Sequence, residues 1–472
     1  MNMYFLVARE NDQSLDQFNI NSGVKVKKVI MDAHLKQSFL QASEFHNNWE
    51  QEFISSSSSN FWSSISYQTV GFYHVFLKEF CSMLMKKGKS FSLGIGAKPS
   101  DFALFFQLGI KNTIAISSQP GNSTAYHFLG LPIPVEIPGK GDGFQNSQLR
   151  IPGSNRQTQN IENIQNLITH FQQIYEQDYI QFYVNTHQSY HGKYRLKNIP
   201  KLTQLFANVR YFLVNHSGIA AYPRTINDKI GFIGGIAFGE NIFQKFHEKI
   251  LTNNEIETVW ETEYECIVIL TFGTLFNFFG MAKNQLSSFI EAFNQHENCL
   301  FIFRIDQFIR NLIEVNHIII QNNVYLTNEM IDIKGILAQR NTKLAIIHCG
   351  QNSLNENKYL GLIIKILIYF YALYAGVPVI CFPFFGDQRY NASVVEYLNL
   401  GEWVIAPHVE NEIGNAINAL LNESNGYQER AQQFAVRLHY QASEISPTQI
   451  FLNAVHNAIE SNVQYGLADF CG

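Results

Sequence analysis

The order of patterns between Leu344 and Val404 constrains the fold of this chain more than any other feature. A short apolar run, Leu344 to Ile347, is followed by a polar turn that holds His348, Cys349 and Gly350. A strand, a tight turn and a helix start, in that order, present backbone N–H groups and the positive end of a helix dipole, and this arrangement binds phosphate. The pattern therefore predicts an α/β domain with an anion site at one edge of a parallel sheet.

Two polar pairs complete the predicted site. Asn352 and Ser353 follow the turn, and both are favourable N-cap residues for a helix. A second apolar run, Val377 to Phe382, leads to Asp387 and Gln388 at the same sheet edge. A carboxylate beside an amide is suited to binding the adjacent hydroxyl groups of a sugar. The histidine of the turn can donate a hydrogen bond to a phosphate, and such a charge-assisted contact contributes about 1.5–3 kcal/mol.

Together these positions resemble the signature of the UDP-glycosyltransferases, of the animal and nematode UDP-glucuronosyltransferase-like type. The resemblance implies that His348 and the turn at Asn352 and Ser353 hold the diphosphate of a UDP-sugar. It further implies that Glu356 binds the ribose, and that Asp387 and Gln388 bind the transferred sugar. The matching residues are His348, Gly350, Asn352, Ser353, Glu356, Gly376, Val377, Pro378, Asp387, Gln388, Asn391 and Ala392.

The resemblance covers most of the chain after residue 80 and implies a GT-B fold, with two facing Rossmann-like α/β domains, parallel sheets and a cleft between them. The segment Ile233 to Ile236 resembles the exit to the interdomain linker. We therefore expect an acceptor-side domain at 1–235 and a UDP-sugar-binding domain with closing helices at 236–472. An apolar run after that linker predicts a strand that ends at Gly273 and Thr274. In the family this turn approaches the donor phosphates, although a simple tight connection also explains it.

Local patterns place the other elements. Strands are predicted at Phe91–Ile95, Thr113–Ser117, Tyr211–Asn215, Cys266–Leu270 and Cys299–Arg304. Helices are predicted at Phe102–Leu108, Gln285–Asn294, Asn411–Leu421, Tyr427–Gln441 and Ile450–Ser461. The resemblance implies that the last helices cross back towards the first domain.

Composition excludes several classes of protein. With 46% hydrophobic and 15% charged residues, the 472-residue chain can bury two to three domain cores and is not a disordered protein. A formal net charge of −5 offers no basic footprint for nucleic acid. The six cysteines show neither metal-ligand spacing nor a disulfide framework, so we interpret them as small buried hydrophobic residues. They leave the redox compartment undetermined.

The catalytic base is the least defined part of the site. The resemblance leads us to expect a histidine in a strand–turn–helix unit near the amino end, but no such unit is recognisable before residue 80. His34 lies in a stretch, Val29 to Leu40, whose periodicity predicts a helix. Asp101 is a weak candidate for the base, and a helix N-cap role explains it as well. Between Val324 and Gln339, Met330 and Ile333 stand where the family supplies a Trp and a Gln to the uracil ring.

These departures leave two alternatives to an active transferase. General base catalysis contributes roughly 10²–10⁴-fold, so a chain without its base is a catalytically impaired UDP-sugar-binding homologue. A nicotinamide-dependent oxidoreductase would share the sheet, but it requires a glycine-rich turn after its first strand and an acidic residue about twenty positions later. We find no such pairing.

Residues 357–371 interrupt the signature, because removing them restores an uninterrupted match to the family. Their Ile, Leu, Tyr and Lys content agrees with translated AT-rich non-coding sequence, so we hypothesise a retained intron or an error in the gene model. Sequencing of spliced transcripts tests this hypothesis. Leu360 to Phe385 carries one charge and exceeds the ~20 residues that a membrane span needs. Pro378, Pro383 and the strand-like residues between them favour a buried strand instead.

The resemblance also implies the reaction and the partners. A hexosyl or glucuronosyl group would move, with inversion, from a UDP-sugar co-substrate to a small lipophilic acceptor, without a cofactor and without a metal. Members of the family are anchored in the endoplasmic reticulum membrane. This sequence shows no signal peptide and no apolar anchor at its end, so we expect a soluble chain as written. Assembly into a homo-oligomer stays open.

Overall fold

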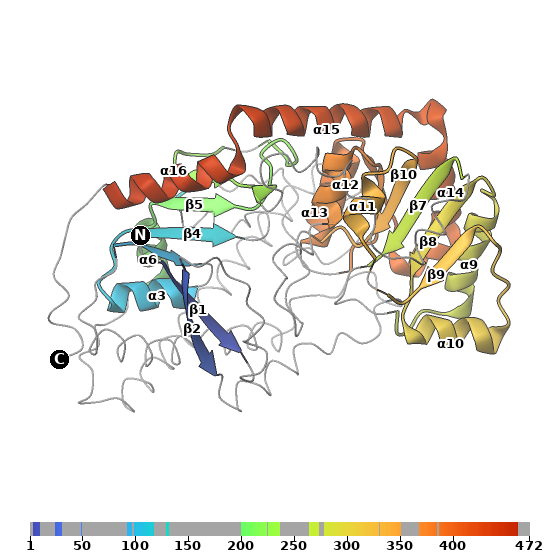
Figure 1. Cartoon of the computed structure of the whole chain (residues 1–472), viewed down its shortest axis with the longest axis horizontal. Coiled ribbons are helices and arrows are strands. Elements are labelled where there is room, and N and C mark those ends of the chain that lie inside the picture. The colour runs from blue at the N-terminus through green and yellow to red at the C-terminus, as the bar shows by residue number, and fades with distance from the viewer. Residues whose placement is uncertain are drawn as a thin grey trace, which may run out of the picture.

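The chain folds into two α/β lobes, each built on a parallel sheet (Figure 1). A computed structural model describes residues 3–9, 24–30, 49, 92–96, 99–117, 129–131, 200–223, 225–236, 264–272, 278–329, 331–350, 368–384 and 387–460. The two parallel-sheet lobes are the pair of Rossmann-like domains that the GT-B interpretation predicts.

The larger sheet has six parallel strands in the order β12-β11-β10-β7-β8-β9. From the centre of the sheet, β7, β8 and β9 follow one another towards one edge, and β10, β11 and β12 towards the other. This is the doubly wound strand order, and the direction in which successive strands are added reverses between β7 and β10. Ligands of such sheets bind outside the carboxyl ends of the strands at the reversal point. The strands are β7 (Cys266–Thr271), β8 (Cys299–Arg304), β9 (Val324–Thr327), β10 (Thr342–Ile347), β11 (Val379–Cys381) and β12 (Gly401–Trp403).

Helices cover both faces of this sheet. All six residues of β7 are buried, and they alternate between the two faces: Ile267 and Ile269 belong to one core cluster, and Val268 and Leu270 to the other. The first cluster is closed by α11 (Ile333–Leu337), α12 (Ile368–Ala375), α13 (Gln388–Tyr397) and α15 (Tyr427–Glu444). The second is closed by α9 (Lys283–Asn294), α10 (Gln307–Asn316) and α14 (Val409–Leu421).

The smaller sheet has four parallel strands in the order β3-β4-β5-β6. Its strands are β3 (Gly94–Gly96), β4 (Thr113–Ser117), β5 (Tyr211–Val214) and β6 (Ile230–Phe232), with helices α3 (Pro99–Gln107) and α6 (Leu202–Ala207). The strand predicted to begin at Phe91 begins at Gly94, because its partner strand β4 begins at Thr113, in register with Gly94. Helix α3 begins three residues before the predicted Phe102, since proline is favourable in the first position of a helix.

The chain returns to this first sheet at its end. Helix α15 runs along the top of Figure 1 towards the first lobe, and α16 (Pro447–Glu460) packs on β4, β5 and β6. Ala454 and Ala458 of α16 share a buried cluster with Ile114, Leu213 and Ile233. The crossing back of the closing helices, which the resemblance implied, is therefore present in the structure.

Hydrogen bonds join the two lobes. The Tyr222 hydroxyl donates to the carbonyl of Ser393 over 3.0 Å, and the Tyr374 hydroxyl donates to the carbonyl of Gly234 over 3.3 Å. We propose that the boundary between the two domains lies near residue 235. Two strand positions support this proposal. The last strand of the first sheet, β6, ends at Phe232, and the first strand of the second sheet, β7, begins at Cys266.

The amino-terminal region corrects the prediction made there. Strands β1 (Met3–Arg9) and β2 (Val24–Ile30) form a parallel pair, which the sequence analysis did not recognise. The helix predicted from Val29 is wrong at Val29 and Ile30, which are the last two residues of β2; Val and Lys alternate over residues 24–27 with the period of a strand, and the strand continues to Ile30. His34 lies outside the described residues. Trp49 is fully buried and stacks on Phe278 of the second lobe, with ring centroids 5.9 Å apart.

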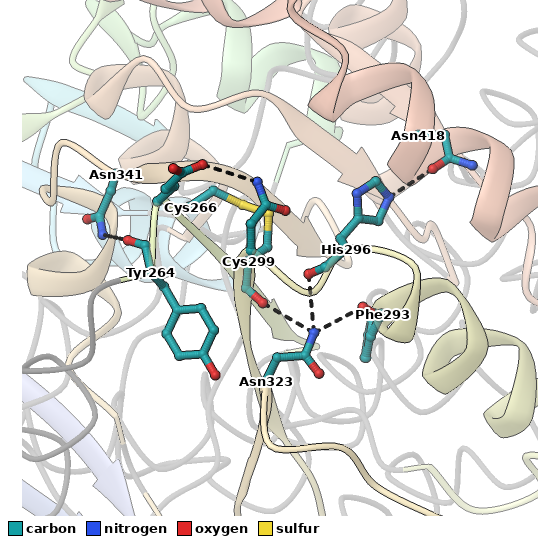
Figure 2. The surroundings of a disulfide bond; sticks show 10 residues. Tyr264, Cys266, Phe293, His296, Cys299, Asn323, Asn341 and Asn418 are labelled. Carbon is teal, nitrogen blue, oxygen red and sulfur yellow. Dashed lines mark hydrogen bonds between the residues drawn. A yellow bond between two sulfur atoms is a disulfide. The ribbon is translucent and has the colours of Figure 1, made fainter.

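The cysteines also differ from the prediction. Cys266, Cys299, Cys349 and Cys381 are buried as expected, but they form two disulfides, Cys266–Cys299 and Cys349–Cys381. Cys266 and Cys299 are register partners on neighbouring parallel strands (Figure 2). The interpretation as unpaired hydrophobic residues was wrong because strand register, which spacing in the sequence does not reveal, decides which sulfur atoms meet.

Candidate functional site

The candidate site lies at the carboxyl ends of three central strands. Ile347 at the end of β10 is the register partner of Thr271 at the end of β7 and of Cys381 at the end of β11. The ladder continues one step further, since the Phe382 N–H donates to the Ile347 carbonyl over 2.8 Å. The turn after β10 and the loop after β11 therefore emerge at the same sheet edge, at the reversal point where ligands of such sheets bind.

His348 is the first residue after β10, and it is only 5% exposed. Burial lowers the pKa of His348 to about 4, so the imidazole is neutral near pH 7. Its Nδ1 atom is buried and has no hydrogen-bond partner among the residues that the structure describes. A buried polar atom without a partner costs roughly 1–3 kcal/mol. A ligand that hydrogen-bonds to this ring would recover that free energy.

The turn after His348 has two backbone features. Cys349 adopts a left-handed conformation with φ 56°, which is uncommon for a residue with a side chain. The imidazole of His348 lies against Gly350: a Cβ atom built there would be 2.8 Å from Nε2 and 2.9 Å from Cδ2 of that ring. Glycine at position 350 therefore leaves the space that the histidine ring occupies.

Helix α13 supplies the second half of the site. Asp387 directly precedes the helix, Gln388 is its first residue, and both are 3% exposed. The Gln388 Oε1 atom accepts from the backbone N–H of Phe384 over 2.7 Å, which fixes the loop after β11. The Asn391 amide donates to the Cys349 carbonyl over 2.8 Å and to the Asp387 carboxylate over 3.4 Å. Asn391 thus ties the histidine turn to α13, a bridging role that the sequence analysis did not assign.

The structure brings four of the predicted donor-site residues together. His348 lies against Gly350, and a Cβ atom on Gly350 would lie 3.5 Å from Cγ of Gln388, which follows Asp387. The other five predicted donor-site residues, Gly273, Thr274, Asn352, Ser353 and Glu356, lie outside the described residues, and their roles stay predictions.

Helix α12 contains the end of the segment interpreted as an insertion. After the histidine turn, the first helix in the described part of the chain begins at Ile368. Residues 368–371 therefore form the first turn of α12. Within this turn Tyr369 is 0% and Tyr371 is 4% exposed, and both belong to the core of the second lobe. The end of the segment is therefore covered by the sheet and the neighbouring helices, and residues 357–367 lie outside the described residues.

Tyr369 adds a second buried polar atom near α13. Burial, and then the acidic neighbours Tyr390 and Asp387, raise the pKa of the Tyr369 phenol far above its ordinary value. Its hydroxyl has no hydrogen-bond partner among the described residues. The family pattern gave no signal for Tyr369, because this residue lies in the segment that the pattern leaves unmatched.

Asp101 belongs to the first turn of α3 and is not its N-cap, so the N-cap interpretation was wrong. The helix starts earlier than predicted, at Pro99. A Cβ atom on Gly96 would lie 2.5 Å from Cβ of Asp101, which places Asp101 beside the carboxyl end of β3. Its role as a catalytic base stays a prediction.

Other sequence predictions concern the base pocket, metals and membranes. Ile333 opens α11 and packs against the core, and Met330 lies outside the described residues. In the described part of the chain no cluster of three His, Cys, Asp or Glu side chains could hold a metal ion. No helix within the described ranges is long and apolar enough to span a membrane.

Comparison with known proteins gives a family match and distant relatives. The family model "UDP-glucoronosyl and UDP-glucosyl transferase" matches residues 150–447. The chain is 23% identical over 229 residues to UDP-glucuronosyltransferase ugt-50 of Caenorhabditis elegans, covering 48% of this chain and 39% of that protein. It is 36% identical over 84 residues to UDP-glycosyltransferase 708A6 of Zea mays, covering 18% and 14%. The aligned parts thus span less than half of these relatives.

Solved structures share the fold over almost the whole chain. The structure of Os79 from O. sativa in complex with UDP superposes with a TM-score of 0.55 at 12% identity, covering 98% of this chain and 94% of that one. A UDP-glucose: anthocyanidin 3-O-glucosyltransferase in complex with UDP gives a TM-score of 0.54 at 11% identity, covering 95% and 89%. At such low identity the likeness establishes the two-domain fold.

Proposed function

Because the chain belongs to the family of UDP-glucuronosyl and UDP-glucosyl transferases, we propose that it transfers a hexosyl or glucuronosyl group from a UDP-sugar to a small lipophilic acceptor with inversion. One observation carries the proposal. A buried, neutral His348 with an unpartnered ring nitrogen lies against Gly350, beside the Asp387–Gln388 pair, at the reversal point of a doubly wound sheet.

The proposed roles follow from the chemistry of each group. The neutral imidazole of His348 donates one N–H to the diphosphate, and its burial strengthens that hydrogen bond by excluding water. Asp387 and Gln388 bind the hydroxyl groups of the sugar. The UDP-sugar serves as co-substrate, and the charge on the departing UDP is stabilised by His348 together with the backbone of the turn. Gly273, Thr274, Asn352, Ser353 and Glu356 complete this donor site in the proposal.

The acceptor class rests on relatives. Os79, which shares the fold, forms a complex with a trichothecene, and another relative of the same fold is named for anthocyanidin. Both names support a small-molecule acceptor for this chain.

A UDP-sugar-binding homologue without efficient transfer is the second candidate function. It is favoured by the position of Asp101, the only candidate base taken from the sequence. In the first turn of α3 the negative charge of Asp101 interacts favourably with the helix dipole, which already gives the residue a structural role. Release of free sugar, or transfer to an acceptor, from a UDP-sugar separates the two candidates, since only the transferase turns over.

We propose that the protein works in the endoplasmic reticulum, where its relatives would be anchored. The two disulfides support an oxidising compartment, because such bonds form and persist there and are rare in the cytosol. Alkylation of free thiols before cell lysis, followed by mass analysis, would contradict this location if all cysteines were labelled.

Calorimetric titration with UDP tests the donor site. His348→Ala removes the proposed phosphate donor, and we expect UDP affinity to fall at least about 10-fold. His456→Ala is the matched control, because His456 is 68% exposed on α16 and pairs only with Glu460 in the described residues. Equal affinity of wild type and His348→Ala would remove the phosphate role from His348.

A further inference from the structure

The Cys349–Cys381 disulfide lies directly behind the candidate phosphate turn. Cys349 follows His348 in the chain, and Cys381 is the last residue of β11, opposite Ile347 in the register. The two Cα atoms are 5.3 Å apart, and both residues are fully buried. The bond thus joins the turn after β10 to the end of the neighbouring strand.

The backbone at Cys349 needs such support. A residue with a side chain is disfavoured in the left-handed region and persists there where its surroundings hold it. Two contacts hold Cys349: its sulfur is bonded to Cys381 on one side, and its carbonyl accepts from Asn391 of α13 on the other. The orientation of the preceding residue, His348, depends on this conformation.

We infer that the Cys349–Cys381 disulfide is a positioning element of the donor site, which fixes the left-handed turn that presents His348 to the UDP diphosphate. The inference rests on the proposed function, because it assumes that this turn binds UDP. Neither cysteine touches the ligand in the proposal, so both act through the histidine.

The second disulfide provides a matched control within the same sheet. Cys266 and Cys299 are the first residues of β7 and β8, at the amino ends of the strands and therefore at the opposite edge from His348. Figure 2 shows the surroundings of this bond, in which Asn323 donates to the carbonyls of Phe293, His296 and Cys299. No predicted donor-site residue is among them.

The two bonds close loops of nearly equal length. The paired cysteines are 32 residues apart in Cys349–Cys381 and 33 apart in Cys266–Cys299. Because the chain entropy that a disulfide removes from the unfolded state depends on the length of the loop that it closes, the two bonds should stabilise the fold by similar amounts. A difference in UDP affinity between the two disulfide variants then reflects where each bond lies in the sheet, and not a difference in the stability of the fold.

The experiment compares Cys349→Ser/Cys381→Ser with Cys266→Ser/Cys299→Ser in the full chain. For each variant UDP affinity is measured by calorimetry, and the melting temperature by circular dichroism. We expect both variants to lose a similar amount in melting temperature. UDP affinity should fall at least about 10-fold in the first variant and change less than about 2-fold in the second. Equal UDP affinity in wild type and the first variant would overturn the inference.

A second measurement does not depend on UDP. Without the bond the turn loosens, water reaches the imidazole, and the pKa of His348 should rise from about 4 towards its usual 6.5. Titration of the His348 ring protons by NMR in the ligand-free protein follows this shift. A pKa that rises in Cys349→Ser/Cys381→Ser, while the wild type fails to bind UDP, would support the positioning role and refute the proposed function. A pKa that stays near 4 in that variant would overturn the positioning role itself.

Discussion

Gly350→Ala tests the histidine turn with a single added methyl group. The new Cβ atom would lie 2.8 Å from Nε2 and 2.9 Å from Cδ2 of His348, closer than Cβ atoms approach other heavy atoms in folded proteins. The backbone at position 350 is not in the left-handed region, so alanine meets no backbone strain there. The change therefore acts on the imidazole, which has to rotate away from its present position.

The geometry sets the size of the effect. Moving a side chain about 30° from its preferred rotamer costs roughly 0.5–1.5 kcal/mol, so the fold should tolerate the substitution. Loss of a charge-assisted hydrogen bond to phosphate costs about 1.5–3 kcal/mol, which weakens UDP binding roughly 10- to 150-fold. Calorimetric titration with UDP at pH 7 measures the affinity, and urea unfolding measures the stability.

Two further variants make the test specific. Gly414→Ala in α14 adds the same methyl group where nothing lies within 4 Å, so it should raise stability by about 0.5–1 kcal/mol and leave UDP binding unchanged. In His348→Ala/Gly350→Ala the methyl group has no ring to displace, so UDP affinity should equal that of His348→Ala alone. If Gly350→Ala binds UDP like the wild type, the ring contact does not control binding and the reasoning fails.

Three other outcomes follow from the structure. The His348 side chain is neutral when buried and has its usual pKa of 6.5 in the unfolded chain, so the free energy of unfolding should fall by up to about 3 kcal/mol as the pH drops from 6.5 to 4. In urea unfolding, the stability of His348→Gln should depend less on pH than that of the wild type. An equal pH dependence of the two proteins would contradict the burial argument. Tyr222→Phe removes the hydrogen bond to Ser393 and should cost about 0.5–1.5 kcal/mol in the same assay, whereas an unchanged midpoint would show that this bond adds nothing between the lobes. Cys266→Ser/Cys299→Ser opens a 33-residue loop and should cost about 4 kcal/mol, and a loss below 1 kcal/mol would refute the bond's stabilising role.

Short-range patterns were sufficient for several elements. The predicted strands Thr113–Ser117 and Cys299–Arg304 agree with β4 and β8 at every residue, because a continuous apolar run bounded by polar residues marks a strand covered on both faces. His348 and Asp387 could be placed at one sheet edge from the order of strands and turns alone. The carboxyl ends of neighbouring parallel strands lie at the same edge of the sheet.

Features that depend on tertiary register could not be read in this way. The Cys349–Cys381 bond requires that β10 and β11 be neighbours with a particular offset, and the bridge made by Asn391 requires α13 to lie against the histidine turn. Trp49 enters the core of the second lobe from a remote part of the chain. None of these contacts leaves a periodic signal in the sequence.

The return of α16 to the first sheet has a consequence for how this protein is made. Ile114 and Leu213 are translated early, but the alanines that cover them, Ala454 and Ala458, leave the ribosome near the end of synthesis. At synthesis rates of roughly 5–20 residues per second, that sheet spends many seconds with an apolar face open to water. The first lobe is thus the first to be synthesised and the last to be completed.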